Sequence, residues 1–254
     1  MTGKLTVVGL GPGSSQQLTP EAEEILRAAD DLFGYGPYLD RVPERATQRR
    51  HASDNRQEIQ RAAQALQAAI EGRTVAVVSG GDPGVFGMAA AVCEALEQGP
   101  AEWRRVDVQV IPGVSAMLAV AARVGAPLGH DFCTLSLSDN LKPWPVVEQR
   151  LELAATAGFV IALYNPISRA RPWQLDRAFA KLGTVLPGTT PVVFGRAVGR
   201  PDERVAITRL TDAQGGNADM ATCIIIGSAQ TRLVERPGNS PLVYTPRGTP
   251  RPAA

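Results

Sequence analysis

The stretch Val78-Ser79-Gly80-Gly81-Asp82-Pro83-Gly84-Val85-Phe86-Gly87 decides the fold class of this chain. It follows a β-branched run at residues 74–78 and precedes an alanine-rich segment at residues 88–96, which predicts strand, loop and helix in that order. Its glycines let a ligand approach the main chain closely, because no side chain stands in the way. Asp82 adds an acceptor carboxylate suited to a hydroxyl or amino group of a ligand. The alternative is that Asp82 only caps the following helix.

Two further glycine loops stand at the ends of predicted strands. Gly9-Leu10-Gly11-Pro12-Gly13 follows a β-type run at residues 5–10, and Pro112-Gly113-Val114-Ser115-Ala116 follows one at residues 106–111. The first loop lacks the last glycine of the dinucleotide fingerprint G-x-G-x-x-G, since Ser14 stands there, and its proline removes a main-chain donor. This argues against the usual nicotinamide motif. It leaves a suitable place for main-chain contacts with a ligand at the carboxyl edge of a sheet.

Outside these loops the chain alternates predicted strands with predicted helices. Further strands are predicted at residues 32–35, 132–138, 159–164, 191–196, 204–210 and 222–227, and helices at 20–29, 54–71, 88–97, 115–124, 145–157 and 172–182. The alternation before residue 124 predicts a mostly parallel sheet, and the close spacing of the last three strands predicts a mixed second sheet. We therefore expect an α/β protein with a first domain at 1–124, a linker at 125–131 and a second domain at 132–254. The tail after Pro237 is expected to fray.

Composition excludes several classes of protein. The chain has 254 residues, of which 44% are hydrophobic and 20% charged, and a net charge of +1, which is typical of a globular protein and argues against bulk nucleic-acid binding. Cys93, Cys133 and Cys223 lie far apart without C-x-x-C spacing, which predicts buried thiols in a reducing compartment and no metal cluster. No apolar run approaches the ~20 residues of a membrane helix, and the N-terminus shows no secretory pattern. The expected location is therefore the cytoplasm, without a membrane partner.

The three loops, in this order, resemble those of the tetrapyrrole methylases, which are S-adenosylmethionine-dependent enzymes of cobalamin and sirohaem synthesis. The resemblance extends from residue 5 to about residue 235. Within the family, residues 125–132, 137–144 and 163–169 are most similar to the precorrin-3B C17-methyltransferase group. Phe86 departs from the pattern, since many relatives carry Tyr after the Gly-Asp-Pro loop.

The resemblance implies two α/β domains with a cleft between them, as in class III S-adenosylmethionine methyltransferases. It implies S-adenosylmethionine as the methyl donor, S-adenosylhomocysteine as its product, no metal, and an anionic tetrapyrrole as substrate. It also implies a homodimer that receives its substrate from neighbouring enzymes of the pathway.

Contacts for individual residues follow from the same resemblance. Donor contacts are implied at the three loops and in the second domain, at Leu10, Gly81, Asp82, Val85, Ser115, Ala116, Leu163, Tyr164, Ala197, Met220 and Thr222. Pro12 would face the tetrapyrrole. Because that substrate carries carboxylates, arginines in loops or at strand ends are candidate partners, namely Arg45, Arg49, Arg169, Arg171 and Arg196. The alternative for each arginine is an ordinary surface charge.

The expected chemistry explains why no catalytic motif is visible. Methyl transfer from a sulfonium requires alignment and exclusion of water more than a protein nucleophile. The resemblance adds contraction of the macrocycle, which begins with removal of a proton from a substrate hydroxyl, and a positioned base assists such a step. His130 is the first candidate, because its ordinary pKa lies near neutrality; its alternative role is to satisfy main-chain groups of the linker. Asp131 and Asp139 are further candidates, with turn capping as the alternative.

Three other functions stay open at this stage. One is another precorrin methyltransferase of the same pathway, such as the enzyme that methylates C11 of precorrin-4. The second is a nucleotide-binding oxidoreductase, for which no complete fingerprint is present. The third is a non-catalytic tetrapyrrole-binding protein that keeps the fold, because fold alone does not define activity.

Overall fold

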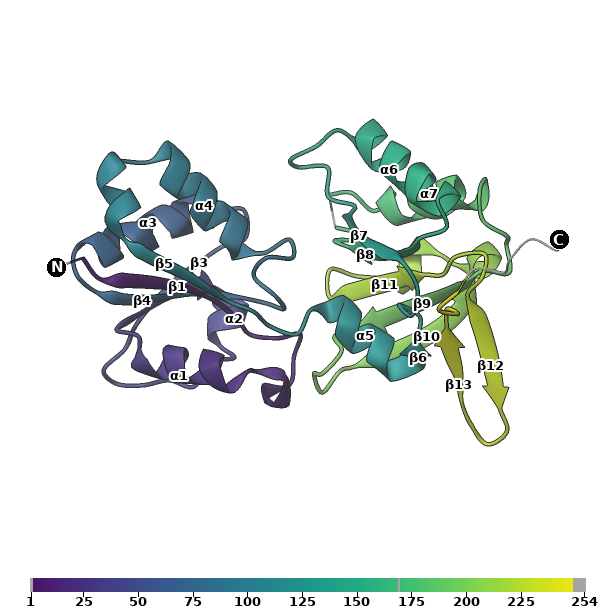
Figure 1. Ribbon diagram of the computed structural model, residues 1–254, viewed down its shortest axis with the longest axis horizontal. Helices are drawn as coiled ribbons and strands as arrows, with labels where there is room; N and C mark the ends of the chain where they lie inside the picture. Colours follow the sequence, from purple (N-terminus) through teal and green to yellow (C-terminus); the bar gives the residue numbers. More distant parts are fainter. Residues whose placement is uncertain (1, 169, 249–254) are drawn as a thin grey trace. The chain divides into compact units, whose positions relative to one another are not determined.

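The computed structural model describes residues 2–168 and 170–248 and divides into two compact units, Met1–Ala116 and Met117–Ala254 (Figure 1). This boundary lies after the first residue of helix α5 (Ala116–Val124), whereas the sequence pattern places it after the whole helix. The residues expected to form a linker belong to the second unit, because β6 (Gly125–Ala126) pairs with β13 (Asn239–Tyr244). Arg169, one of the candidate substrate contacts, lies outside the described residues.

The first unit is built on a parallel sheet of five strands in the order β3-β2-β4-β1-β5. The strands are β1 (Lys4–Gly9), β2 (Asp31–Tyr35), β3 (Arg49–Ser53), β4 (Thr74–Ser79) and β5 (Asp107–Ile111). The α-helices are α1 (Pro20–Ala28), α2 (Gly36–Leu39), α3 (Glu58–Ile70) and α4 (Met88–Gln98), and short 3-10 helices occupy Ser15–Gln17 and Ala101–Arg105. The mostly parallel first sheet is therefore confirmed. The strand β3 was not predicted, since its sequence, Arg-Arg-His-Ala-Ser, has the composition of a solvated loop.

Side-chain alternation along the central strands determines how the helices cover the first sheet. In β1, Leu5 and Val7 pack in one core with α3 and α4, while Val8 packs in another core with α1 and α2. Successive residues of a strand point to opposite faces, so an unbroken apolar run is buried on both sides. Helix α1 begins where the sequence predicts, because the Thr19 hydroxyl accepts the Ala22 N–H at 3.2 Å and Pro20 occupies the first turn.

The second unit contains a mixed sheet in the order β10-β9-β11-β8-β7, as predicted. Its strands are β7 (Phe132–Ser136), β8 (Val160–Tyr164), β9 (Pro191–Arg196), β10 (Arg204–Arg209) and β11 (Thr222–Ile226). Strands β7 and β8 are parallel, and β11 runs antiparallel to both β8 and β9. The helices α6 (Trp144–Thr156) and α7 (Gln174–Gly183) cover one face, and short 3-10 helices lie at Leu210–Asp212 and Gly215–Asn217.

As far as residue 248, where the described part of the chain ends, the segment after Pro237 forms regular structure, which corrects the expectation of fraying there. Strands β12 (Arg232–Arg236) and β13 form an antiparallel hairpin, and β6 extends it to three strands. Thr245, which follows β13, is 2% exposed and donates a hydrogen bond to the Pro127 carbonyl at 2.6 Å. The glycine in this segment serves a turn, since Gly238 has a φ of +74°. The segment is held in place by its pairing with β6, which lies far away in the sequence. No helix between residues 2 and 248, within the described part of the chain, is long and apolar enough to cross a membrane.

Candidate active site

The three glycine loops of the first unit meet at the carboxyl edge of its sheet. Strand β1 lies between β4 and β5, so the loops that follow these strands are neighbours. The main chains of Gly11 and Gly81 exchange hydrogen bonds at 3.2 and 2.9 Å. Both glycines have left-handed torsions, with φ of +66° and +69°. A Cβ atom on Gly113 would lie 2.4 Å from the Gly81 carbonyl oxygen, so the approach of the loops requires glycine there.

Asp82 fastens two of these loops together. One carboxylate oxygen accepts the N–H of Gly84 at 2.8 Å, and the other accepts the N–H of Gly113 at 3.0 Å. The alternative helix-capping role does not apply, since α4 has Gly87 at its N-cap position. Each carboxylate oxygen has a second lone pair, so Asp82 has acceptor capacity left for a ligand.

The main chain around Gly81 offers polar groups that a ligand can contact. A Cβ atom built on Gly81 would meet nothing nearer than the Ala116 nitrogen at 3.9 Å. The atoms nearest to this point are main-chain atoms of Val114, Ser115 and Ala116. Such a surface can take the amino-acid and ribose parts of S-adenosylmethionine, whose polar groups pair with amides and carbonyls.

In the second unit, one edge of the sheet gathers several predicted residues. The strands β7, β8 and β9 end at this edge and β11 begins there, since β11 is antiparallel to its neighbours and Thr222 pairs with Arg196. The Ala197 N–H donates to the Ala221 carbonyl at 2.9 Å, and Ala197 has an unusual positive φ of +49°. The structure therefore brings together Tyr164, Ala197, Met220 and Thr222.

The Tyr164 hydroxyl stabilises the start of helix α5. It accepts the N–H of Met117 at 3.0 Å. On the neighbouring strand β11, burial raises the pKa of the Cys223 thiol to about 12, against a smaller lowering by its hydrogen bond with Tyr164. Tyr164 thus has a structural role at this edge besides any contact with a ligand.

Arg196 belongs to a cluster of charges. Its Nε donates to Asp219 at 2.7 Å and its Nη1 to Asp202 at 2.6 Å. Burial alone would raise the pKa of Asp219, but hydrogen bonds from Thr222 and Arg196 outweigh it and hold this pKa below its usual range. The guanidinium is therefore already neutralised by two carboxylates of its own unit.

Comparison with known proteins identifies the family. Residues 4–214 match the family described as Tetrapyrrole (Corrin/Porphyrin) Methylases. A relative from Sinorhizobium sp., named precorrin-3B C(17)-methyltransferase, is 65% identical over 247 residues, which is 97% of either chain. The chain belongs to the tetrapyrrole methylase family.

Solved structures agree with this family and with the α/β fold. The crystal structure of the methyltransferase CobJ is 46% identical, has a TM-score of 0.91, and matches 96% of this chain and 100% of its own. A uroporphyrin-III C-methyltransferase from Thermus thermophilus, crystallised with S-adenosyl homocysteine, is 23% identical with a TM-score of 0.66, and matches 89% of this chain and 98% of its own. The second likeness shows the fold alone.

Five residues expected to contact the donor are buried in the methylase fold, namely Leu10, Ser115, Leu163, Ala197 and Thr222. Leu10 is 4% exposed in the core with α1 and α2, and Leu163 is fully buried in the core with α6 and α7. For Leu10 and Leu163, only the main-chain groups are available to a ligand. The expected donor contacts in the first unit other than Leu10 lie in the glycine loops or at the start of α5; they are Gly81, Asp82, Val85, Ser115 and Ala116.

His130 and Asp131 lie at the opposite edge of the second sheet from Tyr164. They precede the first residue of β7, which pairs with Val160 at the start of β8, whereas Tyr164 ends β8. The His130 Nδ1 accepts the N–H of Asp131 at 2.8 Å, which places the ring proton of neutral His130 on Nε2. This contact is the main-chain role that the sequence left as the alternative for His130.

Asp139 and Arg171, predicted for different roles, pair with each other. The Arg171 guanidinium donates to the side chains of Asp139 and Asn140. Gln174 donates to the same Asp139 oxygen at 3.1 Å and to the Leu137 carbonyl at 2.7 Å. These contacts hold the loop after β7 through one carboxylate oxygen of Asp139.

Arg45 and Arg49 lie away from the glycine loops. Arg49 is the first residue of β3 and Arg45 precedes it, so both are at the amino edge of the parallel sheet. Arg49 donates to the fully buried Asp31 at 2.9 Å. Pro12, in contrast, directly follows Gly11 in the first glycine loop.

Two residues that sequence reasoning missed support the loops. The Arg41 guanidinium donates to the carbonyls of Leu10 and Gly11 at 2.8 and 2.9 Å. Tyr38 of α2 packs over Gly80, where a Cβ atom would lie 2.6 Å from its ring. Neither residue stands in a motif, so the sequence carries no signal for these contacts.

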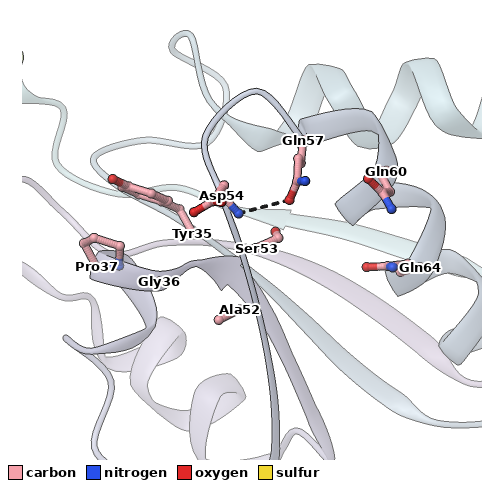
Figure 2. Close-up of a pocket in the computed structure, with 9 residues that line it drawn as sticks. All are labelled: Tyr35, Gly36, Pro37, Ala52, Ser53, Asp54, Gln57, Gln60 and Gln64. Carbon is pink, nitrogen blue, oxygen red and sulfur yellow. Dashed lines mark hydrogen bonds between the residues drawn. The ribbon is translucent and has the colours of Figure 1, made fainter.

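A polar pocket of about 610 Å³ lies at the carboxyl ends of β2 and β3, also in the first unit. Figure 2 shows that α3 contributes glutamine side chains and the strand ends contribute polar groups; six of the lining residues are Tyr35, Ser53, Asp54, Gln57, Gln60 and Gln64. None of them was predicted from the sequence. Among the described residues, no group of three or more His, Cys, Asp or Glu side chains is placed to hold a metal ion.

Proposed function

We propose that this chain methylates precorrin-3B at C17 with S-adenosylmethionine and contracts the macrocycle to give precorrin-4 in cobalamin biosynthesis. The observation that carries the proposal is the 65% identity, over nearly the full length of both chains, to a protein named precorrin-3B C(17)-methyltransferase. The joined glycine loops support it, because they offer the main-chain surface that an adenosyl donor requires. A homodimer and direct receipt of the substrate belong to the same proposal.

In this proposal the first unit holds the donor chiefly through main-chain groups. S-adenosylmethionine supplies the activated methyl group. The chain contributes orientation, since the loops at Gly11, Gly81 and Gly113 are tied together by hydrogen bonds and leave little freedom. Asp82 holds the loops through both oxygens and accepts a further donor from the ligand.

Residues of the second unit have a more limited role in the proposal. Tyr164, Ala197, Met220 and Thr222 share one edge and are proposed to contact the donor. Arg171 and Arg196 stay candidate partners of the substrate carboxylates. They would bind them through the guanidinium N–H groups that do not donate to Asp139, Asp202 or Asp219. The proton acceptor for ring contraction is not assigned to His130, Asp131 or Asp139, because their contacts give each a structural explanation or place it at the other edge.

The test is incubation of the chain with precorrin-3B and S-adenosylmethionine, with the absorption spectrum and S-adenosylhomocysteine followed together. We expect one S-adenosylhomocysteine for each tetrapyrrole converted, together with the spectral change of ring contraction. S-adenosylhomocysteine formed without that change would instead favour another precorrin methyltransferase, and precorrin-4 is the substrate to try next. No turnover and no calorimetric binding of S-adenosylhomocysteine would overturn the proposal, and NADH binding would favour the oxidoreductase.

A further inference from the structure

The side chain of Tyr38, in helix α2, lies directly against the glycine loop that follows β4. A Cβ atom on Gly80 would lie 2.6 Å from the ring carbon that bears the Tyr38 hydroxyl and 2.9 Å from the hydroxyl oxygen. The ring can come this close only because residue 80 is glycine. Gly80 directly precedes Gly81, whose main chain bonds to Gly11. The Tyr38 hydroxyl therefore lies at the carboxyl edge of the first sheet, beside the surface proposed for the methyl donor.

The fold holds the ring of Tyr38 but does not use its hydroxyl. The ring packs against the core that contains α1 and α2, and the Tyr35 ring meets it edge-on, with 5.5 Å between the centroids. Tyr38 is half-buried, and none of the hydrogen bonds within residues 2–168 and 170–248 involves its hydroxyl. Phenylalanine would fill the same space, so packing explains the ring and leaves the hydroxyl available to a ligand.

A buried positive charge lies near this hydroxyl. Arg61 of α3 is 3% exposed and donates to the Ser53 hydroxyl and to the Asp54 carbonyl, both at 2.8 Å. In the described part of the chain it forms no ion pair with a carboxylate. Burial lowers the pKa of Arg61, against smaller raising effects of the charges of Glu58 and Tyr38. The guanidinium is thus close enough to Tyr38 to interact with it electrostatically, and it favours a negatively charged oxygen atom there.

The position of Tyr38 on the sheet separates it from the donor contacts. Strand β4 lies between β1 and β2. The bonds that join the glycine loops run from the loop after β4 toward β1 and β5, whereas Tyr38 reaches Gly80 from the β2 side. The polar pocket at the ends of β2 and β3 continues this side, and Tyr35 lines it (Figure 2). A ligand that extends from the donor across this part of the edge is a large one, as a tetrapyrrole is.

We propose that the Tyr38 hydroxyl donates a hydrogen bond to a carboxylate oxygen of the tetrapyrrole and so positions this substrate against the methyl donor. This inference rests on the proposed function. Hydrogen bonds to an ionised acceptor are shorter and stronger than those between neutral groups. The buried charge of Arg61 strengthens this one further, because it also attracts the carboxylate. Tyr38 contributes to binding of the tetrapyrrole and not to binding of the methyl donor.

The experiment compares Tyr38→Phe with wild type and with Tyr244→Phe. Tyr244 is the matched control, because it is another half-buried tyrosine and lies in β13 of the second unit, outside the proposed site. We expect Tyr38→Phe to raise the KM for precorrin-3B about ten-fold, which corresponds to about 1.4 kcal/mol. The Kd for S-adenosylhomocysteine and the melting temperature should stay at their wild-type values, since the ring and the glycine loop are unchanged. Tyr244→Phe should match wild type in all three measurements.

Each other outcome overturns the inference. An unchanged KM in Tyr38→Phe shows that the hydroxyl does not contact the substrate. An equal rise in the Kd for S-adenosylhomocysteine shows that Tyr38 acts through the donor, and a melting temperature several degrees lower shows that the hydroxyl supports the fold. An equal rise in KM for Tyr244→Phe shows that the effect is not specific to this site. Absence of wild-type turnover on precorrin-3B refutes the proposed function and this inference with it, whereas turnover with an unchanged KM in Tyr38→Phe refutes the inference alone.

Discussion

Replacing Gly113 by alanine tests whether the contact between glycine loops forms the donor site. The new Cβ atom would lie 2.4 Å from the Gly81 carbonyl oxygen and 3.1 Å from the carbonyl carbon of Gly9. Carbon and oxygen atoms in ordinary contact are about 3.4 Å apart, so the Gly81 loop must move by about 1 Å. Gly36→Ala is the matched control in the same unit, because nothing lies within 4 Å of a Cβ atom there.

The size of the effect follows from the hydrogen bonds that such a shift disturbs. Gly81 is held by two main-chain bonds to Gly11, at 3.2 and 2.9 Å, and a movement of about 1 Å would break at least one of them. With roughly 1 kcal/mol for each bond and an overpacking cost of 1–3 kcal/mol, we estimate about 2 kcal/mol. This corresponds to about 30-fold weaker binding if the strain falls on the ligand-bound form. If the strain falls on the free protein as well, the same 2 kcal/mol lowers the melting temperature by about 4–8 °C.

Titration calorimetry with S-adenosylhomocysteine and thermal unfolding measure both effects. We expect Gly113→Ala to lose affinity about 30-fold, or to melt several degrees lower, while Gly36→Ala matches wild type in both assays. Wild-type affinity and stability in Gly113→Ala would refute the reasoning, since the loops would then tolerate a side chain where the structure leaves no room.

Three further predictions concern residues outside the glycine loops. His130→Gln should turn over precorrin-3B within a few-fold of wild type in a single-cycle assay, because its Nδ1 holds a main-chain N–H; a fall of ~10² or more would restore it as a base. Burial alone would raise the pKa of Asp31, but hydrogen bonds from His51 and Arg73 and the charge of Arg49 hold it below its usual value. Asp31→Asn should therefore lower the free energy of unfolding by about 2 kcal/mol at pH 7. The difference from wild type should shrink as the pH falls below about 4, where Asp31 becomes protonated. A difference that does not change with pH in urea unfolding would contradict this. The pKa of Cys223 is raised to about 12, so iodoacetamide at pH 8 should label exposed Cys93 in the native chain and label Cys223 only after unfolding. Equal labelling rates of the two cysteines, measured by peptide mapping, would contradict this.

The local pattern of the sequence was sufficient to predict most elements and the three glycine loops. Apolar runs followed by glycine predicted β1, β4 and β5, and the contact between Gly11 and Gly81 confirms that their loops share one edge. The edge strand β3 and the hairpin of β12 and β13 were missed, because charged, glycine-rich and proline-rich segments have loop composition. Their strand form depends on neighbours such as β2 and β6, which lie elsewhere in the chain.

The sequence by itself determined the α/β class, the parallel and mixed sheets and the family, because these depend on short-range periodicity and on glycine positions that can be read along the chain. Only the tertiary structure decided which chemical groups are available. Strand direction places Arg49 at the edge of the first sheet opposite the glycine loops, and His130 at the edge of the second sheet opposite Tyr164. Ion pairs with Asp139 and Asp219 engage Arg171 and Arg196. The partner of a charge and the end of a sheet at which it lies depend on residues far away in sequence. Local composition therefore does not determine them.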